Sequence, residues 1–250
     1  MHRAASLFVV LLLVSACHAG LAGPPAETGG ELVSLGVPGF GPSVVSVPAG
    51  TRGPKPVLVV AHGAWDRPEW HCELWQRIVG ERGFVLCLGG RRVDDRVPFE
   101  QAAFYYPDHH WLGRALTAAI RVLEARYGSR VDTRRAVYTG FSQGAIMGAL
   151  VLGDKPIDVG AALLIEGGAG EWNVARAKRY RSRGGERVIH MCGTPGCPRL
   201  ARRATRYLER GGVTARVEYF PDAGHSLGGG VEAALPAALD WLVAGDPRWR

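Results

Sequence analysis

The chain has 250 residues, of which 47% are hydrophobic and 21% charged, a composition that excludes a disordered chain and suits one globular α/β domain. The formal charge is +7, and only three of the 30 basic residues are lysines. The short arginine clusters are scattered over predicted loops and helix ends, so they predict a solvated basic surface and no nucleic-acid partner. These clusters are Arg91-Arg92, Arg134-Arg135 and Arg202-Arg203.

The N-terminal segment has the pattern of an export signal. A short basic start precedes an apolar run from Leu7 to Val14, which is too short to span a bilayer and remain there. The sequence Val14-Ser15-Ala16-Cys17 then resembles a bacterial lipobox, in which cleavage precedes a cysteine that becomes lipidated. We predict a signal peptide over residues 1–16 and a lipid on Cys17; ordinary cleavage after Ala19 is the alternative. The protein is then expected in the bacterial cell envelope, held at a membrane on the periplasmic or outer-membrane side.

Residues 17–30 are rich in glycine and proline and predict a flexible tether, so the folded domain is expected over residues 31–250. Short apolar segments alternate with helical patterns along this domain. Strands are predicted at 31–37, 43–48, 55–63, 83–89, 135–140, 159–168, 186–193 and 215–220. Helices are predicted at 69–81, from Asp108 to Tyr127-Gly128, from Ser142 to Leu150, at 199–209 and at 229–244. This alternation predicts a mostly parallel sheet covered by helices on both faces.

Ser142 lies at the centre of the pentapeptide Gly140-Phe141-Ser142-Gln143-Gly144, between a predicted strand and a predicted helix. A tight turn at this point holds a serine in strained backbone geometry and needs small residues on both sides. The amino end of the helix also favours negative charge where an oxyanion would form. Ser142 is therefore a candidate nucleophile, and a helix-capping serine is the alternative.

Two further motifs have matching positions in the chain. His62-Gly63 follows the first long parallel strand, and His225 lies between the last strand and the last helix. Imidazole has a pKa near working pH, which suits a general base, and a base that follows the serine in chain order is typical of hydrolases with this layout. We predict that His225 is the base and that His62 has a structural role.

Together these motifs resemble the α/β hydrolases, close in layout to compact carboxylesterases and dienelactone-hydrolase-like proteins. The resemblance covers the chain from about Glu31 to its end and leaves little room for a lid domain. It implies an oxyanion hole made by the backbone N–H groups of Ala64 and Gln143. It also implies a catalytic acid, which most members carry as an aspartate after the penultimate strand.

The chain departs from that pattern because the corresponding loop, Cys192-Gly193-Thr194-Pro195-Gly196-Cys197, contains no acid. Glu166, at the end of the preceding strand, is our predicted replacement. Asp222 and Asp66 are the alternatives, as is a Ser–His dyad without an acid.

Four cysteines remain besides Cys17. Export to an oxidising compartment favours disulfides, and local spacing favours the pairs Cys72–Cys87 and Cys192–Cys197 among three possible pairings. A zinc site is the alternative, but neither pair has the short spacing of a zinc knuckle.

The resulting hypothesis is a serine hydrolase that cleaves a small-molecule carboxylic ester through an acyl-enzyme, with no metal or organic cofactor implied. Phe104, Tyr105, Tyr106 and Trp111 are expected in the wall of the substrate pocket, although ordinary loop packing explains them equally well. The alternatives are a catalytically silent binding lipoprotein, or a small peptidase or acyltransferase of the same fold.

The lipobox leads to a direct test. Replacing Cys17 with alanine (C17A) should move the protein from the membrane to the soluble fraction, because the lipid is then absent. Membrane fractionation and mass spectrometry measure this. A native mature chain that begins beyond Cys17 and carries no lipid would contradict the prediction.

Overall fold

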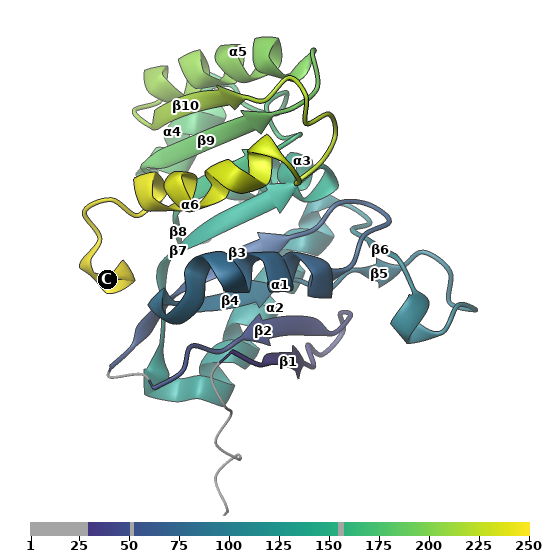
Figure 1. Cartoon of the computed structure of the whole chain (residues 1–250). Helices are drawn as coiled ribbons and strands as arrows, with labels where there is room; N and C mark the ends of the chain where they lie inside the picture. The colour runs from purple at the N-terminus through teal and green to yellow at the C-terminus, as the bar shows by residue number, and fades with distance from the viewer. Residues whose placement is uncertain (1–29, 51–52, 155–157) are drawn as a thin grey trace, which may run out of the picture.

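The computed structural model describes residues 30–50, 53–154 and 158–250 (Figure 1). The predicted signal peptide, Cys17 and all of the tether except Gly30 lie outside the described residues. An eight-stranded sheet has the order β1-β2-β4-β3-β7-β8-β9-β10. Its strands are β1 (Leu32–Leu35), β2 (Ser43–Ser46), β3 (Lys55–Ala61), β4 (Phe84–Cys87), β7 (Val131–Phe141), β8 (Val159–Ile165), β9 (Arg187–Cys192) and β10 (Thr214–Tyr219).

The sheet is mostly parallel, as predicted. The pairs β4–β3, β3–β7, β7–β8, β8–β9 and β9–β10 are parallel, whereas β2 pairs antiparallel with both β1 and β4. The parallel strands therefore end at one common edge. The central strands β3 and β8 are almost wholly buried, which explains their continuous apolar sequences.

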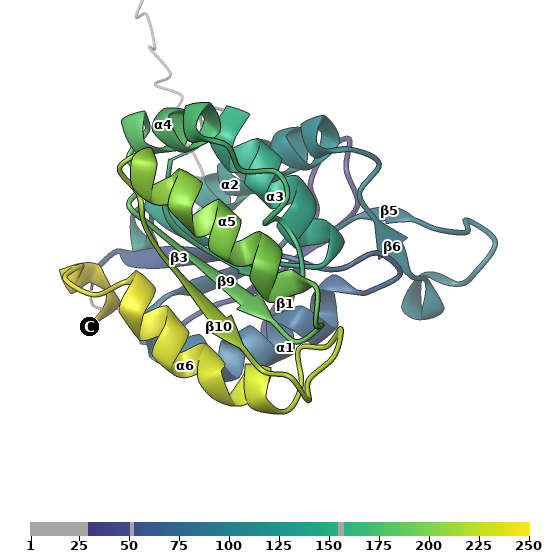
Figure 2. The ribbon, with the colours of Figure 1, turned by 90° about the horizontal axis from the view of Figure 1, so that it is seen from above.

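Helices cover both faces of the sheet (Figure 2). The helices are α1 (Pro68–Val79), α2 (His109–Tyr127), α3 (Gln143–Asp154), α4 (Val174–Ser182), α5 (Cys197–Arg210) and α6 (Gly230–Leu242). One core layer contains side chains of α1 and α6, and the other contains side chains of α2, α3, α4 and α5. The predicted architecture is therefore confirmed.

Individual boundaries differ from the predictions. Strand β7 begins at Val131, earlier than expected, and passes a bulge near Ala136. A two-stranded ribbon of β5 (Arg91–Arg92) and β6 (Phe104–Tyr105) was not predicted, and its segment projects from the side of the domain (Figures 1 and 2). Strands of two residues give no periodic signal, which is why the sequence did not reveal them. Among the described residues, no helix combines the length and apolar character that crossing a bilayer requires.

The four cysteines of the domain form the two predicted pairs at disulfide distance. Cys72 of α1 faces Cys87 of β4, with their Cα atoms 5.7 Å apart. Cys192, the last residue of β9, faces Cys197, the first residue of α5, with their Cα atoms 5.4 Å apart. One pair ties a helix to the sheet, and the other closes the loop between β9 and α5.

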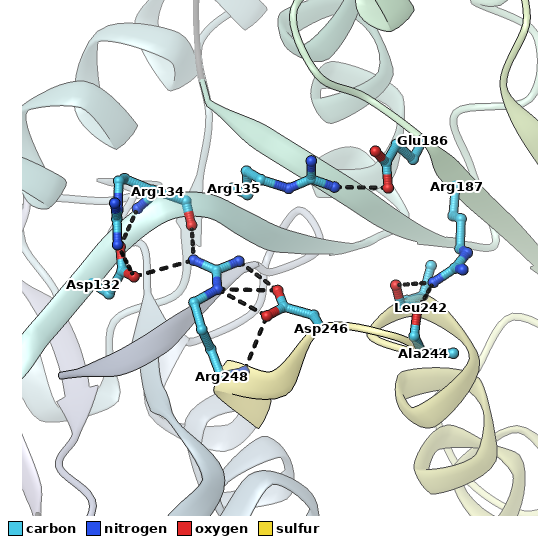
Figure 3. Close-up of polar contacts among 9 residues, drawn as sticks. All are labelled: Asp132, Arg134, Arg135, Glu186, Arg187, Leu242, Ala244, Asp246 and Arg248. Atoms are coloured by element: carbon cyan, nitrogen blue, oxygen red, sulfur yellow. Dashed lines mark hydrogen bonds and ion pairs between the residues drawn. The ribbon is translucent and has the colours of Figure 1, made fainter. Parts of the chain in front are cut away.

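An ion-pair network fastens the C-terminal residues to the opposite edge of the sheet, at the amino ends of the strands. Figure 3 shows Arg248 between Asp132 and Asp246. The Arg248 guanidinium lies 3.4 Å from Asp132 Oδ2 and donates to Asp246 Oδ1 at 2.9 Å. Arg134 also donates to Asp132, from Nε at 2.9 Å and from Nη2 at 2.8 Å. The side chain of Asp132 is only 7% exposed, so its charge depends on these partners.

This network predicts an acid-sensitive contribution to stability. Hydrogen bonds from Arg134 lower the pKa of Asp132 from 3.8 to about 2. Because the pKa is lower in the folded state, the stabilisation is present above pH 4 and is lost as the pH falls towards 2. Replacing Asp132 with asparagine (D132N) should lower the free energy of unfolding by about 2 kcal/mol at pH 7, and the difference should shrink below pH 4. Urea unfolding at several pH values measures this.

Asp94 provides the matched control, since it pairs with Arg96 at the same spacing but on an exposed loop. The D94N variant should unfold at the same urea concentration as the unaltered protein. A D132N variant that is as stable as the D94N variant at pH 7 would contradict the prediction.

Candidate active site

Ser142 occupies a sharp turn between β7 and α3, at the edge where the parallel strands end. Its φ is +48°, in the left-handed region that a non-glycine residue seldom adopts. The turn is held by hydrogen bonds from Ser142 N to Ile165 O and from Ile146 N to Ser142 O, both 2.9 Å long. The surrounding backbone therefore keeps the serine in its strained conformation.

The flanking glycines are required by close backbone contacts. A Cβ on Gly140 would lie 2.6 Å from the backbone of Gly144, and a Cβ on Gly144 would overlap the carbonyl group of Ala61. In addition, Gly144 N donates to His62 O at 3.1 Å. The pentapeptide is thus a packed strand–turn–helix unit, as the sequence predicted.

His225 lies beside Ser142 although the two residues are far apart in sequence. Its Nε2 is 2.9 Å from Ser142 Oγ, within hydrogen-bond distance. The ring of His225 packs against the ring of Phe141, with centroids 5.1 Å apart. The imidazole is 53% exposed, so it is open to water and to an incoming molecule.

Glu166 approaches the other nitrogen of the same imidazole. It follows β8 directly, has a φ of +51°, and its side chain is only 2% exposed. Its Oε2 lies 3.4 Å from His225 Nδ1, a long contact for a hydrogen bond. The other atoms around the carboxylate belong to the loop after β9: Gly193 N donates to Oε1, Thr194 N donates to Oε1 at 3.0 Å, and Thr194 Oγ1 donates to Oε2 at 2.8 Å.

The two alternative carboxylates lie elsewhere. Asp66 accepts a 2.6 Å hydrogen bond from His71 Nε2 and a 2.9 Å bond from Arg67 N. Asp222 is exposed, and within the described part of the chain the carboxylate paired with His225 is that of Glu166. The structure therefore brings Ser142, His225 and Glu166 together. Asp66 and Asp222 do not belong to this chain of contacts.

The N–H groups predicted to form an oxyanion hole belong to Ala64 and Gln143. The loop of Ala64 adjoins the nucleophile, since a Cβ on Gly63 would lie 3.5 Å from Ser142 Cβ. Within the described part of the chain, the N–H groups of Ala64 and Gln143 make no turn or loop hydrogen bond. Gln143 directly follows Ser142 and begins α3, so its N–H belongs to the first turn of that helix.

His62 is buried next to this loop and forms hydrogen bonds with it. Burial lowers the pKa of His62 to about 4, so its ring is neutral at pH 7, and Nδ1 can donate to Gly63 O at 2.6 Å. Its backbone N–H donates to the hydroxyl of Tyr106 at 3.1 Å. Tyr106 N in turn donates to Gln143 Oε1 at 2.8 Å, which fixes the side chain of Gln143. His62 is thus a buried residue that hydrogen-bonds to its neighbours and lies apart from the contact between Ser142 and His225.

The aromatic residues predicted for the pocket wall lie mainly in supporting positions. Phe104 and Tyr106 are fully buried, and Trp111 packs on Phe40 with ring centroids 5.0 Å apart. Tyr105 is half-buried and belongs to the β5–β6 ribbon. None of the four lines the cleft that contains His225. The buried side chains Phe104 and Tyr106 therefore agree with the alternative expectation of ordinary loop packing.

The cleft beside His225 has a volume of about 390 Å³ and lies between α1 and the start of α6. Apolar side chains of Trp70, Leu74, Phe141 and Leu227 line it, together with the Asp66–His71 pair. Sequence reasoning missed the contribution of α1. The position of α1 in the chain could have indicated this contribution. The helix follows the His62-Gly63 loop, so it begins at the same sheet edge as Ser142.

Other polar clusters of the described residues do not form an open ligand site. Glu166, Cys192 and Cys197 are the one group there with metal-binding atom types close together, but their two sulfurs pair with each other. A second cavity, of about 460 Å³, lies at the opposite sheet edge and is lined by several arginines. Of these, Arg135 is bound to Glu186 at 2.7 Å and Arg248 to Asp246, so these guanidinium groups already have partners.

Comparisons with known proteins identify the fold. No family model and no curated protein sequence matches the chain. Among solved structures, a candidate dienelactone hydrolase from Klebsiella pneumoniae superposes with a TM-score of 0.65 at 18% identity, covering 86% of this chain and 98% of that one. Fluorophosphonate-binding serine hydrolase F from Staphylococcus aureus gives 0.61 at 14% identity, covering 87% and 99%. A Bacillus cereus carboxylesterase gives 0.56 at 20%, covering 80% and 92%. The chain has the α/β-hydrolase fold.

The position of Glu166 leads to a mutational prediction. Changing it to glutamine (E166Q) keeps the shape but removes the negative charge next to His225 Nδ1, so the imidazole loses the partner that would orient it. We expect kcat for ester hydrolysis to fall by about 10³-fold or more, with KM little changed. Steady-state kinetics with a short p-nitrophenyl ester measures both constants.

Asp222, three residues before His225, is the control because it is exposed. The D222N variant should retain nearly full kcat. A large loss of kcat in D222N together with near-normal kcat in E166Q would show that the acid had been assigned to the wrong residue.

Proposed function

We propose that this protein is a serine hydrolase that cleaves carboxylic esters through an acyl-enzyme on Ser142. The observation that carries the proposal is the 2.9 Å contact of Ser142 Oγ with His225 Nε2 at a strained strand–turn–helix apex. In this arrangement His225 can take the hydroxyl proton as Ser142 attacks the acyl carbon. The proton then passes to the leaving alcohol, which departs.

The second half of the reaction uses the same groups in reverse order. Water enters beside the exposed imidazole, gives a proton to His225 and attacks the acyl-enzyme, which releases the acid and restores Ser142. The N–H groups of Ala64 and Gln143 are positioned to bind the oxyanion in both halves. Glu166 stabilises the imidazolium that forms in each step and holds Nδ1–H towards itself.

An apolar ester suits the surroundings of Ser142. Among the described residues, four large hydrophobic side chains are exposed: Trp65, Trp70, Ile146 and Tyr219. All four belong to segments at the edge where the parallel strands end: the loop after β3, the first turns of α1 and α3, and the end of β10. Two of them lie near the proposed site: Trp70 lines the cleft that contains His225, and Ile146 N donates to Ser142 O at 2.9 Å.

The comparisons support the same class of activity by analogy. The similar structures include a carboxylesterase and a fluorophosphonate-binding serine hydrolase, both at 20% identity or less. Export and attachment through Cys17 remain part of the proposal on sequence grounds alone. The enzyme would then act on esters that reach the cell envelope.

The decisive experiment asks whether Ser142 is a reactive nucleophile. The protein should react with a fluorophosphonate probe and hydrolyse short p-nitrophenyl esters, and replacing Ser142 with alanine (S142A) should abolish both. Mass spectrometry of the labelled protein should place the probe on the peptide that contains Ser142. Circular dichroism checks that the variant remains folded.

Ser182, an exposed serine at the end of α4, serves as the control residue, and the S182A variant should react as the unaltered protein does. Hydrolysis that survives in S142A would refute the serine-hydrolase assignment. An unaltered protein that neither reacts with the probe nor cleaves esters would favour the non-catalytic binding protein.

A further inference from the structure

The loop that follows β9 is closed by a covalent link at its base. Four residues, 193–196, separate Cys192 at the end of β9 from Cys197 at the start of α5. The two cysteines are paired, and Cys197 N also donates to Thr194 O at 3.2 Å. Cys192 is fully buried and Cys197 packs against the core, so both ends of the loop are fixed.

This closed loop supplies hydrogen bonds to the buried carboxylate of Glu166. Two backbone N–H groups, of Gly193 and Thr194, donate to Oε1, and the hydroxyl of Thr194 donates to Oε2. Among the described residues, no lysine or arginine forms an ion pair with Glu166. Since a buried polar group needs hydrogen-bond partners, these three donors of the loop hold the carboxylate in place.

The Thr194 hydroxyl acts on the oxygen that faces the imidazole. Its 2.8 Å bond is to Oε2, and Oε2 is also the atom 3.4 Å from His225 Nδ1. The same loop touches the segment that carries His225, because a Cβ on Gly193 would overlap the carbonyl oxygen of Gly224. A displacement of the loop would therefore disturb both the carboxylate and the histidine.

We propose that Thr194 is a positioning residue for Glu166 and that the Cys192–Cys197 disulfide locks it in place, so that full activity requires this disulfide. The proposal rests on the proposed hydrolase function. Reduction by a dithiol would add two electrons and two protons to the S–S bond, leaving thiols on Cys192 and Cys197 and a disulfide in the reductant. The loop would then lose its covalent closure, and the hydrogen bonds that it donates to Glu166 would no longer be held at fixed positions.

The first test distinguishes the effect of the Thr194 hydroxyl from the effect of the side chain's volume. Replacing Thr194 with valine (T194V) keeps the volume and removes the donor, and should lower kcat about 10- to 100-fold, the factor that corresponds to one hydrogen bond to a charged group. KM should stay within about threefold, since Thr194 does not line the cleft. Replacing Thr194 with serine (T194S) keeps the hydroxyl and should restore kcat to within about threefold of the unaltered protein.

The second test compares the two disulfides. Replacing both Cys192 and Cys197 with alanine should lower kcat at least tenfold with KM little changed, because Glu166 is no longer held in register. Replacing both Cys72 and Cys87 is the matched control, since it removes a cross-link that does not touch the Glu166 loop and should leave kcat within about threefold. In that control protein, dithiothreitol should lower kcat as the Cys192/Cys197 variant does, and reoxidation should restore it.

The outcomes distinguish this proposal from the proposed function. A protein whose Ser142 does not react with the probe fails both. A reactive protein in which T194V has normal kcat, or in which T194S is as impaired as T194V, keeps the hydrolase function but overturns the role of Thr194. Equal losses of kcat on removal of either disulfide would overturn the role of the Cys192–Cys197 lock.

Discussion

The contact between Ser142 Oγ and His225 Nε2 joins two residues that are 83 positions apart, and most of the fold serves to make it possible. Strand β7 places the serine at the sheet edge, and β10, at the end of the sheet, leads into the segment with the histidine. Between them lie β8 and β9, which contribute Glu166 and its supporting loop. Parallel strands end side by side, so residues from four separate segments of sequence meet at one edge.

Strain is concentrated at this edge. Ser142 and Glu166 follow the neighbouring strands β7 and β8 directly, and both have positive φ values of about +50°. Such backbone conformations persist only where the surroundings over-determine them. Here the turn at Ser142 is held by a hydrogen bond to Ile165, and Glu166 N donates to Met191 O at 2.9 Å. The sheet hydrogen bonding thus continues one residue past each strand and fixes both side chains.

The sequence predicted the central features because they depend on local patterns. Continuous apolar runs marked β3 and β8, and the spacing of Asp108 and Gly128 marked both ends of α2, where Asp108 accepts from Trp111 N at 2.7 Å. The turn at Ser142 was predictable because its glycines are in the same short segment. The cysteine pairs followed from spacing along the chain.

What the sequence could not reveal depends on contacts between distant segments. Tyr106 looked like a pocket residue, but its hydroxyl is buried against His62 and Leu88. The role of Trp70 in the cleft required knowing that α1 and α6 lie side by side on one face. Thr194 had no signal of its own, because the two features of its loop that the sequence shows are the missing acid and the two cysteines. Its hydrogen bond to Glu166 can be found only from the structure.

The place of β10 in the sheet has a consequence for the contact between Ser142 and His225. His225 belongs to the segment after β10, and β10 pairs only with β9, at the end of the sheet. The turn at Ser142 is built by β3, β7 and β8 alone, so its hydrogen bonds do not depend on whether β10 is docked. If His225 is the base of the proposed hydrolase, a molecule in which β10 detaches would keep a shaped serine turn and lose its activity.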